Sequence, residues 1–149
     1  MDLRAVLVDD EQLARDELGY LLSQVGGVEI MAFAGNGVEA LTTIDRLRPD
    51  VVFLDVQMPG LTGFEVARRL LDAGAMSQII FVTAYDQHAI EAFEVNAVDY
   101  LLKPVEQMRL EVALDRARRR IRGERVLGNA ATSSGVNPAQ LERIIELVT

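Results

Sequence analysis

Acidic side chains follow two short apolar runs of this sequence, at the point where each run ends. Asp9 and Asp10 come directly after the run at 5–8, and Asp55 comes directly after the run at 51–54. Carboxylates that lie close together repel one another unless a cation sits among them. Oxygen ligands with no neighbouring His or Cys favour a hard ion, and Mg²⁺ is the usual one where phosphate is handled. The three acids are therefore candidate ligands of Mg²⁺.

Two further polar residues follow apolar runs in the same way. Thr83 follows the run at 79–82, and Lys103 follows the run at 97–102. A carboxylate such as Asp55 can attack phosphorus as a nucleophile and form an acyl phosphate. The transferred phosphoryl group spreads negative charge over its oxygens, which a metal ion and a cationic side chain stabilise. The five residues thus supply a nucleophile, a metal site, a cation and a hydroxyl donor.

Short β-branched runs and amphipathic stretches alternate along the chain, which predicts an α/β fold. The predicted strands are 5–8, 28–34, 51–54, 79–82 and 97–102, and the predicted helices are 14–25, 38–47, 63–71, 86–94 and 106–122. Five strand–helix units in sequence predict a doubly wound parallel sheet with helices on both faces. Ligands of such sheets bind outside the carboxyl ends of the strands. If strands one, three, four and five adjoin, the five polar residues converge there.

Each of these residues also has an ordinary structural interpretation. An Asp after a strand is often the N-cap of the next helix, and for Asp9 or Asp10 alone this alternative is equally good. Asp55 could serve a turn, and Thr83 could simply end a strand. Lys103 and Pro104 could form a plain turn, with an X-Pro bond that is a candidate for the cis form. Capping does not explain such residues at the ends of four of the five predicted strands, least of all the lysine.

The segments around these positions resemble the receiver domain of two-component response regulators. They are VDDE (8–11), AGNGVEAL (34–41), PDVVFLDVQMPG (49–60) and YLLKP (100–104), and the resemblance covers about residues 3–122. It implies a flavodoxin-like fold with five strands in the order 2-1-3-4-5. It also implies that a sensor histidine kinase supplies a phosphoryl group to Asp55.

The resemblance further implies a role for each site residue. Asp10 and Asp55 would bind Mg²⁺ directly, together with the backbone carbonyl of Gln57, whereas Asp9 would act largely through a bound water. Thr83 and Lys103 would hold the phosphoryl oxygens.

Tyr100 matches the switch aromatic of the family, which turns inward when Thr83 moves toward the phosphate. The alternative for Tyr100 is a half-buried aromatic of a strand. Gln57 and Tyr85 occupy positions that vary in the family, so the sequence does not predict the lifetime of the phosphate.

A subfamily is also indicated. The segments FVTAYD (81–86), AIEAFE (89–94) and AVDYLLKP (97–104) resemble LytTR-type regulators, which usually carry a DNA-binding domain after a linker. Transcription regulation, with DNA as a partner, is therefore implied only through an output domain of a longer parent protein.

Composition narrows the function classes. The 149 residues carry a net charge of −8, and the acidic body argues against nucleic-acid binding by the main domain. The absence of Cys excludes disulfides and thiolate metal sites and fits the cytoplasmic location that we expect. We find no signal peptide, and no apolar stretch approaches the roughly 20 residues that span a bilayer.

The chain divides into three predicted regions. Residues 1–122 form the receiver domain, 123–137 a flexible linker, and 138–149 a short amphipathic helix. The apolar stripe of that helix consists of Leu141, Ile144, Ile145 and Val148. This stripe needs a partner, which could be the main domain, a second copy of the chain or downstream sequence. In the last case, residues 138–149 would be the start of a truncated region.

The predicted output surface is the face formed by the fourth helix, fifth strand and fifth helix. It carries acidic residues in its first half and arginines in its last: Asp86, Glu91, Glu94 and Asp99, then Arg109, Arg116, Arg118, Arg119, Arg120 and Arg122. We hypothesise that phosphorylation favours a homodimer in which these charges pair across a two-fold axis.

Three other functions compete with the receiver interpretation. A Mg²⁺-dependent phosphatase with an Asp nucleophile usually needs a second acid two residues later, where this chain has Gln57. No Gly-rich phosphate loop follows the first strand, which argues against a nucleotide-binding enzyme. A phosphorylation-independent interaction module is the main alternative. We expect no enzymatic activity beyond Mg²⁺-dependent self-phosphorylation and autodephosphorylation.

Overall fold

Five parallel strands form one sheet in the computed structural model, which describes residues 2–87 and 89–123. The strands are β1 (Leu3–Val8), β2 (Val28–Ala34), β3 (Val51–Leu54), β4 (Gln78–Thr83) and β5 (Asp99–Leu102). The helices are α1 (Gln12–Val25), α2 (Gly37–Leu47), α3 (Gly63–Asp72), α4 (Ala89–Glu94) and α5 (Gln107–Ile121). The strand order β2-β1-β3-β4-β5 and the alternation of strands and helices confirm the predicted fold.

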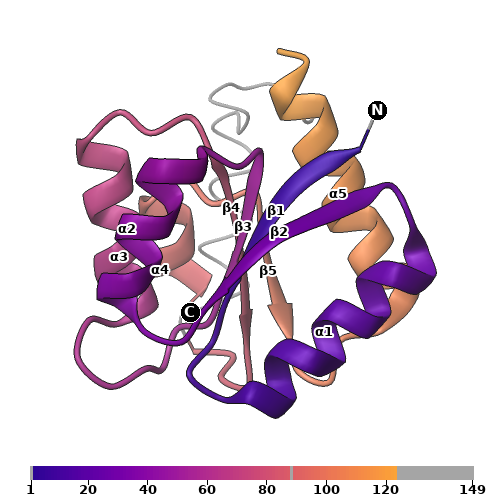
Figure 1. Cartoon of the computed structure of the whole chain (residues 1–149), viewed down its shortest axis with the longest axis horizontal. Helices are drawn as coiled ribbons and strands as arrows, with labels where there is room; N and C mark the ends of the chain where they lie inside the picture. Colours follow the sequence, from indigo (N-terminus) through magenta and orange to yellow (C-terminus); the bar gives the residue numbers. More distant parts are fainter. Residues whose placement is uncertain (1, 88, 124–149) are drawn as a thin grey trace.

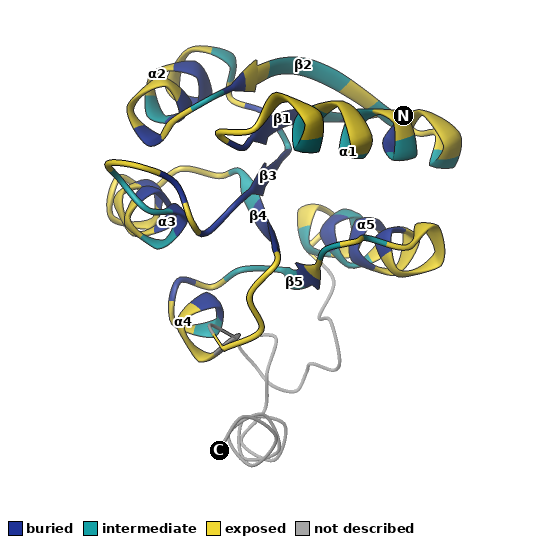
Figure 2. Cartoon of the chain, turned by 90° about the horizontal axis from the view of Figure 1, so that it is seen from below, coloured by how far each residue is buried: buried dark blue, intermediate teal, exposed yellow. Residues whose placement is uncertain are grey.

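Helices cover both faces of the sheet. α2, α3 and α4 lie on one face, and α1 and α5 lie on the other (Figure 1). Successive strand residues point to opposite faces, so Val6 and Val8 join one core cluster while Ala5 and Leu7 join the other. Burial on both sides explains why the inner strands are continuous apolar runs, and Figure 2 shows the buried residues along the sheet between the two helix layers.

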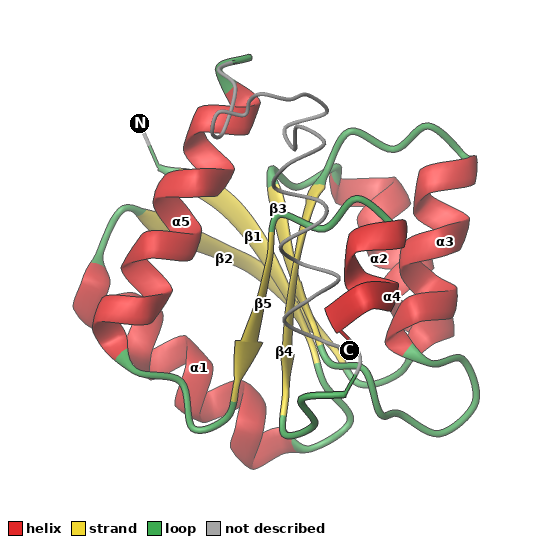
Figure 3. Cartoon of the chain, turned by 180° about the vertical axis from the view of Figure 1, so that it is seen from behind, coloured by secondary structure: helices red, strands yellow, loops and turns green. Residues whose placement is uncertain are grey.

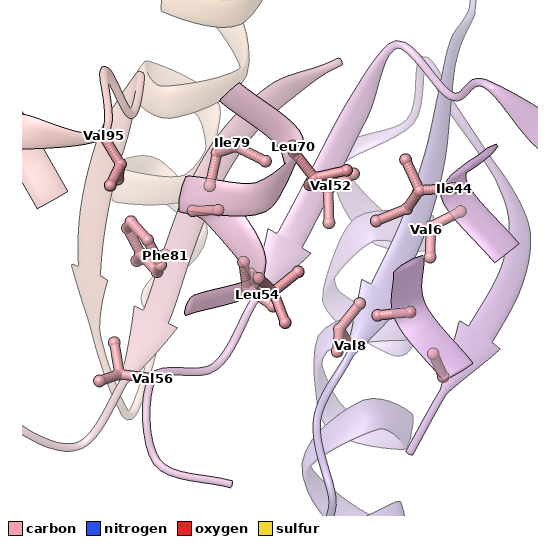
Figure 4. Packing of buried hydrophobic residues seen from close by; sticks show 14 of the residues in the cluster. Val6, Val8, Ile44, Val52, Leu54, Val56, Leu70, Ile79, Phe81 and Val95 are labelled. Carbon is pink, nitrogen blue, oxygen red and sulfur yellow. The ribbon is translucent and has the colours of Figure 1, made fainter. Parts of the chain in front are cut away.

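The cluster beneath α2 and α3 fixes the strands that lead to the site. Val8, Leu54 and Phe81 come from β1, β3 and β4 and pack into one buried group (Figure 4). At about 25 cal/mol per Å² of apolar surface, such burial is the main stabilising contribution to the fold. The carboxyl-terminal halves of three strands are therefore held in fixed relation to one another.

Local signals set the ends of the helices. The Asn36 side chain accepts the amide of Glu39 at the start of α2. Thr62 and Glu65 form a reciprocal capping box at the start of α3. Gly26, at a φ of 80°, ends α1, as its position after the apolar stripe predicts.

Several predicted boundaries differ from the structure by one to three residues, among them the starts of the fourth helix and the fifth strand. The fourth helix begins at Ala89 rather than at Asp86, which lies in a bend. The fifth strand begins at Asp99 rather than at Ala97, because Asn96 turns the chain at a φ of 63° and Arg120 binds the carbonyls of Asn96 and Ala97.

Within residues 2–87 and 89–123, none of the helices has the length and apolar character to cross a bilayer. Except for Gly123, the predicted linker lies outside the described residues, and so does the predicted helix at 138–149.

Candidate functional site

The strand ends bring the predicted site residues to one edge of the sheet. Val8 pairs with Leu54 and Leu54 with Phe81, so the residues that follow β1 and β3 emerge together. Thr83 ends β4 opposite Leu102 of β5. All strands run in the same direction toward this edge, which lies at the bottom of the view in Figure 3.

Three carboxylates meet at this edge. Ligand oxygens of Asp9, Asp10 and Asp55 all lie within 4.8 Å of one another. Asp9 and Asp55 are buried, with 7% and 6% of their surface exposed, whereas Asp10 is exposed. Oxygen ligands at this spacing, partly open to solvent, suit a hard divalent cation. The donor set therefore fits a magnesium-type site.

Lys103 supplies the positive charge beside these acids. Its Nζ lies 2.8 Å from Asp9 Oδ2 and 3.7 Å from Asp55 Oδ2. Burial alone would lower the pKa of Lys103, but its hydrogen bond to Asp9 and the charge of Asp55 raise that pKa above its ordinary value. Lys103 is therefore a permanent cation that contacts both buried carboxylates.

The pKa of Asp55 is raised by its surroundings in this site. Burial, followed by repulsion from Asp9, raises the pKa of Asp55 from 3.8 to about 6. Lys103 and the amides of Val56 and Gln57 act in the opposite direction. The Val56 amide donates to Asp55 Oδ1 at 2.8 Å, which orients the carboxylate. A bound cation would favour the ionised, nucleophilic form.

The loop after β3 is packed tightly against the backbone of Asp55. A Cβ added at Gly63 would lie 2.1 Å from the Asp55 carbonyl oxygen, and the Gly63 amide donates to the Val56 carbonyl at 2.9 Å. Only glycine permits this approach, so the start of α3 holds the Asp55 segment in place.

Thr83 and Tyr100 belong to one hydrogen-bonded chain beside the acids. Thr83 is fully buried, and its hydroxyl oxygen accepts the amide of Tyr85 at 3.3 Å. The Tyr100 hydroxyl donates to the carbonyl of Tyr85. The Tyr100 ring lies 6.2 Å from that of Phe81, so this half-buried aromatic contacts the core as well as the loop after β4. The Lys103–Pro104 bond that follows β5 is cis.

The structure adds two residues that the sequence analysis did not single out. Arg15 Nη1 donates to the Asp9 carbonyl at 2.6 Å, and the Glu11 amide donates to Asp9 Oδ1 at 2.9 Å. Arg15 lies four residues after Glu11 in the first turn of α1, a position from which a long side chain can reach back to the strand end. That spacing is the signal that could have identified it.

Comparisons with known proteins agree with this site. The family profile described as response regulator receiver domain matches residues 5–115. The chain is 51% identical over 114 residues to an uncharacterized response regulatory protein of Vibrio cholerae, covering 76% of this chain and 48% of that protein. It is 49% identical over 118 residues to the positive alginate biosynthesis regulatory protein of Pseudomonas aeruginosa, covering 78% of this chain and 48% of that protein.

The backbone of a solved structure is also similar to that of this chain. The response regulatory domain of MrkE from Klebsiella pneumoniae superposes with a TM-score of 0.74 at 31% identity, covering 82% of this chain and 100% of that chain. The chain spans about half the length of the curated relatives named above. With the strand order, the acidic cluster and the profile match in agreement, the chain belongs to the response regulator receiver domain family.

Proposed function

We propose that Asp55 accepts a phosphoryl group from the phosphohistidine of a sensor histidine kinase in a Mg²⁺-dependent reaction. The observation that carries this proposal is the meeting of Asp9, Asp10 and Asp55 with Lys103 at the strand ends. An Asp55 carboxylate oxygen forms the new bond to phosphorus as the P–N bond of the donor breaks. Family membership supports a histidine kinase as the partner and a signalling role rather than that of a conventional enzyme. It also supports a cytoplasmic location.

The metal ligands in this proposal are Asp10, Asp55 and the carbonyl of Gln57, with Asp9 acting through water. The hydrogen bonds of Asp9 support its indirect role, because Oδ1 accepts the Glu11 amide and Oδ2 accepts Lys103. When bound, Mg²⁺ would neutralise phosphoryl charge and lower the repulsion among the acids. Lys103 holds a phosphoryl oxygen on the opposite side.

The proposed switch consists of Thr83 and Tyr100. The Thr83 hydroxyl donates to a phosphoryl oxygen, and Tyr100 adjusts its position as Thr83 moves. The shared contact of both residues with Tyr85 supports this coupling. Phosphorylation thus biases an element with two arrangements, which changes the surface formed by α4, β5 and α5.

Output follows from this surface. We propose a homodimer through α4, β5 and α5, and control of transcription through a DNA-binding domain of a longer LytTR-type parent. The alginate regulator of Pseudomonas aeruginosa and the transcriptional regulatory protein BtsR of Salmonella typhi, each about twice as long as the matched segment, support a regulatory parent.

Intact mass after incubation with acetyl phosphate and Mg²⁺ tests the acceptor. We expect one phosphoryl adduct on the native chain and none on Asp55→Ala. The matched control is Asp50→Ala, an acid before β3 whose side chain binds the Arg4 amide at the other end of the strands. An adduct that survives Asp55→Ala moves the acceptor elsewhere. A native chain without any adduct favours the phosphorylation-independent interaction module.

A further inference from the structure

We propose that Asp99, held by two arginines of α5, is a positioning residue for the Thr83 hydroxyl. This inference rests on the proposed phosphorylation of Asp55 and extends it to a cluster outside the strand-end site. Asp99, Arg109 and Arg116 act on the site through the backbone and side chain of Tyr100 and through the loop residue Tyr85.

The Asp99 carboxylate is a buried hub of hydrogen bonds. Only 6% of its side chain is exposed. Arg109 Nη1 donates to Asp99 Oδ2 at 2.8 Å and its Nη2 donates to Oδ1 at 2.6 Å, while Arg116 Nη1 donates to Oδ2 at 3.1 Å. A bidentate Arg–carboxylate pair is geometrically specific as well as strong. Removing the charge of Asp99 would leave two guanidinium groups without their shared partner.

This hub also holds the backbone of Tyr100. Asp99 Oδ1 accepts the Tyr100 amide at 2.8 Å, so the orientation of the carboxylate fixes β5 at this residue. On the neighbouring segment, Arg120 of α5 donates to the carbonyls of Asn96 at 2.9 Å and Ala97 at 3.3 Å. Three arginines of one helix therefore fix the approach to β5 and its first residue.

From Tyr100 the hydrogen bonds continue to the site. The Tyr100 hydroxyl donates to the Tyr85 carbonyl, and the Tyr85 amide donates to Thr83 Oγ1 at 3.3 Å. This last bond uses an acceptor position of the Thr83 oxygen and leaves its proton for donation to a phosphoryl oxygen. A hydroxyl that accepts one hydrogen bond also becomes a better donor in the next, because such chains polarise cooperatively.

The connected bonds therefore run from a charged cluster on α5 to the hydroxyl that meets the phosphoryl group. A network of this kind transmits a change at one end as a change in affinity at the other, and such coupling acts equally in both directions. Whatever engages Arg109 and Arg116 at the surface would alter phosphoryl binding, and phosphorylation would alter that engagement.

The test measures the dissociation constant for beryllofluoride, a phosphoryl mimic, by calorimetry at saturating Mg²⁺. We expect Asp99→Asn to weaken binding by about 3- to 10-fold, the size of typical long-range couplings. The same substitution in a Tyr100→Phe background should then have no further effect, because the link to Tyr85 is already absent. Such a double-mutant cycle separates transmission through Tyr100 from a general loss of structure.

Matched variants keep the test decisive. Arg119→Gln removes an ion pair with Asp115 on the same helix, at 3.1 Å and outside the network, and should leave the dissociation constant unchanged. If Asp99→Asn does not fold, Arg109→Gln and Arg116→Gln replace it in the same cycle.

Three results would overturn the inference. Unchanged affinity in Asp99→Asn removes the coupling, and equal weakening in both backgrounds shows that Asp99 acts independently of the Tyr100 hydroxyl. With either result, the proposed phosphorylation of Asp55 still stands if the native chain binds beryllofluoride. A native chain that binds no beryllofluoride overturns both proposals.

Discussion

The side chains at the strand ends carry more negative than positive charge. Three carboxylates face the single ammonium of Lys103, and two of the three are buried. Desolvation makes this arrangement costly without a cation, which is why the pKa of Asp55 rises even though Lys103 lies 3.7 Å away. The same residues that make the metal-free site unfavourable are those that would bind Mg²⁺ and a phosphoryl group.

This charge imbalance predicts a pH-dependent stability difference between the native chain and Asp55→Asn. Burial and the charge of Asp9 raise the pKa of Asp55 from 3.8 to about 6 in the folded protein, so the folded state binds more protons than the unfolded state between these pH values. The free energy of unfolding of the native chain therefore falls as the pH rises through this window. Above pH 6, the stability that protonation of Asp55 contributes is lost. We therefore expect Asp55→Asn to be more stable than the native chain by about 2–3 kcal/mol at about pH 8.

Urea unfolding in the absence of divalent ions measures this difference. The gap should shrink as the pH falls toward about 4, because Asp55 is then protonated in the folded state and the native chain regains the stability that this protonation contributes. Added Mg²⁺ should also close the gap at high pH, since a bound cation favours the ionised carboxylate. A gap that does not change with pH would assign the effect to packing rather than to charge.

The meeting of the predicted site residues at one edge of the sheet was predictable from the sequence, because each stands at the end of an apolar run. Their supporting contacts were not. The bond of Arg15 to the Asp9 carbonyl and the bonds of Arg109 and Arg116 to Asp99 depend on how helices pack against the sheet. Local pattern gives a residue its element and its end of the strand, whereas such bonds depend on distances between elements.

Among the elements, β2 and β3 begin and end as predicted, because an apolar run with turn residues on both sides marks each of them. The start of α4 could not be predicted in the same way. A helix beginning at 86 would direct the Tyr85 carbonyl to the amide of residue 89, but this carbonyl accepts the Tyr100 hydroxyl instead. A contact across 15 positions of the chain thus overrides the local helical pattern.

The contact between α3 and β3 gives a prediction at this scale. In Gly63→Ala the new Cβ would meet the Asp55 carbonyl oxygen at 2.1 Å, so α3 must shift away from the site. We expect a loss of about 1–3 kcal/mol of unfolding free energy, as for other substitutions that overpack a tight contact. We also expect weaker Mg²⁺ binding, because the Asp55 segment is displaced. Urea unfolding and calorimetry with Mg²⁺ measure the two effects.

Gly19→Ala provides the matched control. Gly19 lies within α1, and a Cβ there would meet side-chain atoms at ordinary contact distances of 3.7 Å or more. Alanine should therefore stabilise the protein by up to about 1 kcal/mol, through helix propensity, and leave Mg²⁺ binding unchanged. If Gly63→Ala unfolds at the same urea concentration as the native chain and binds Mg²⁺ with the same affinity, α3 does not constrain the site.

At the scale of the whole molecule, the arginines of α5 have a different use from the one that the sequence suggested. Arg109 and Arg116 bind Asp99 of the same protomer, Arg118 binds the Gly27 carbonyl, and Arg120 binds the turn before β5. Such groups are already engaged before a second copy arrives. Cross-pairing of these charges is therefore a weaker basis for dimerisation than the hypothesis assumed, and the apolar residues of the same edge become the better candidates.

The apolar residues of this edge give the final prediction. Three large apolar side chains are exposed at this edge: Ile90 of α4 (38%), Leu102 of β5 (46%) and Val112 of α5 (45%). β5 is the edge strand of the sheet, and α4 and α5 lie on either side of it (Figure 3). Burying them against the same residues of a second copy would favour a two-fold dimer. Sedimentation across the micromolar range should show a dimer when beryllofluoride and Mg²⁺ are added to the native chain, and a monomer for Val112→Glu.

The matched control is Leu71→Glu, which adds the same charge at a 41% exposed leucine of α3 and should still dimerise. A native chain that remains monomeric with beryllofluoride bound, or a Val112→Glu variant that still dimerises, would place the output of the switch on another surface.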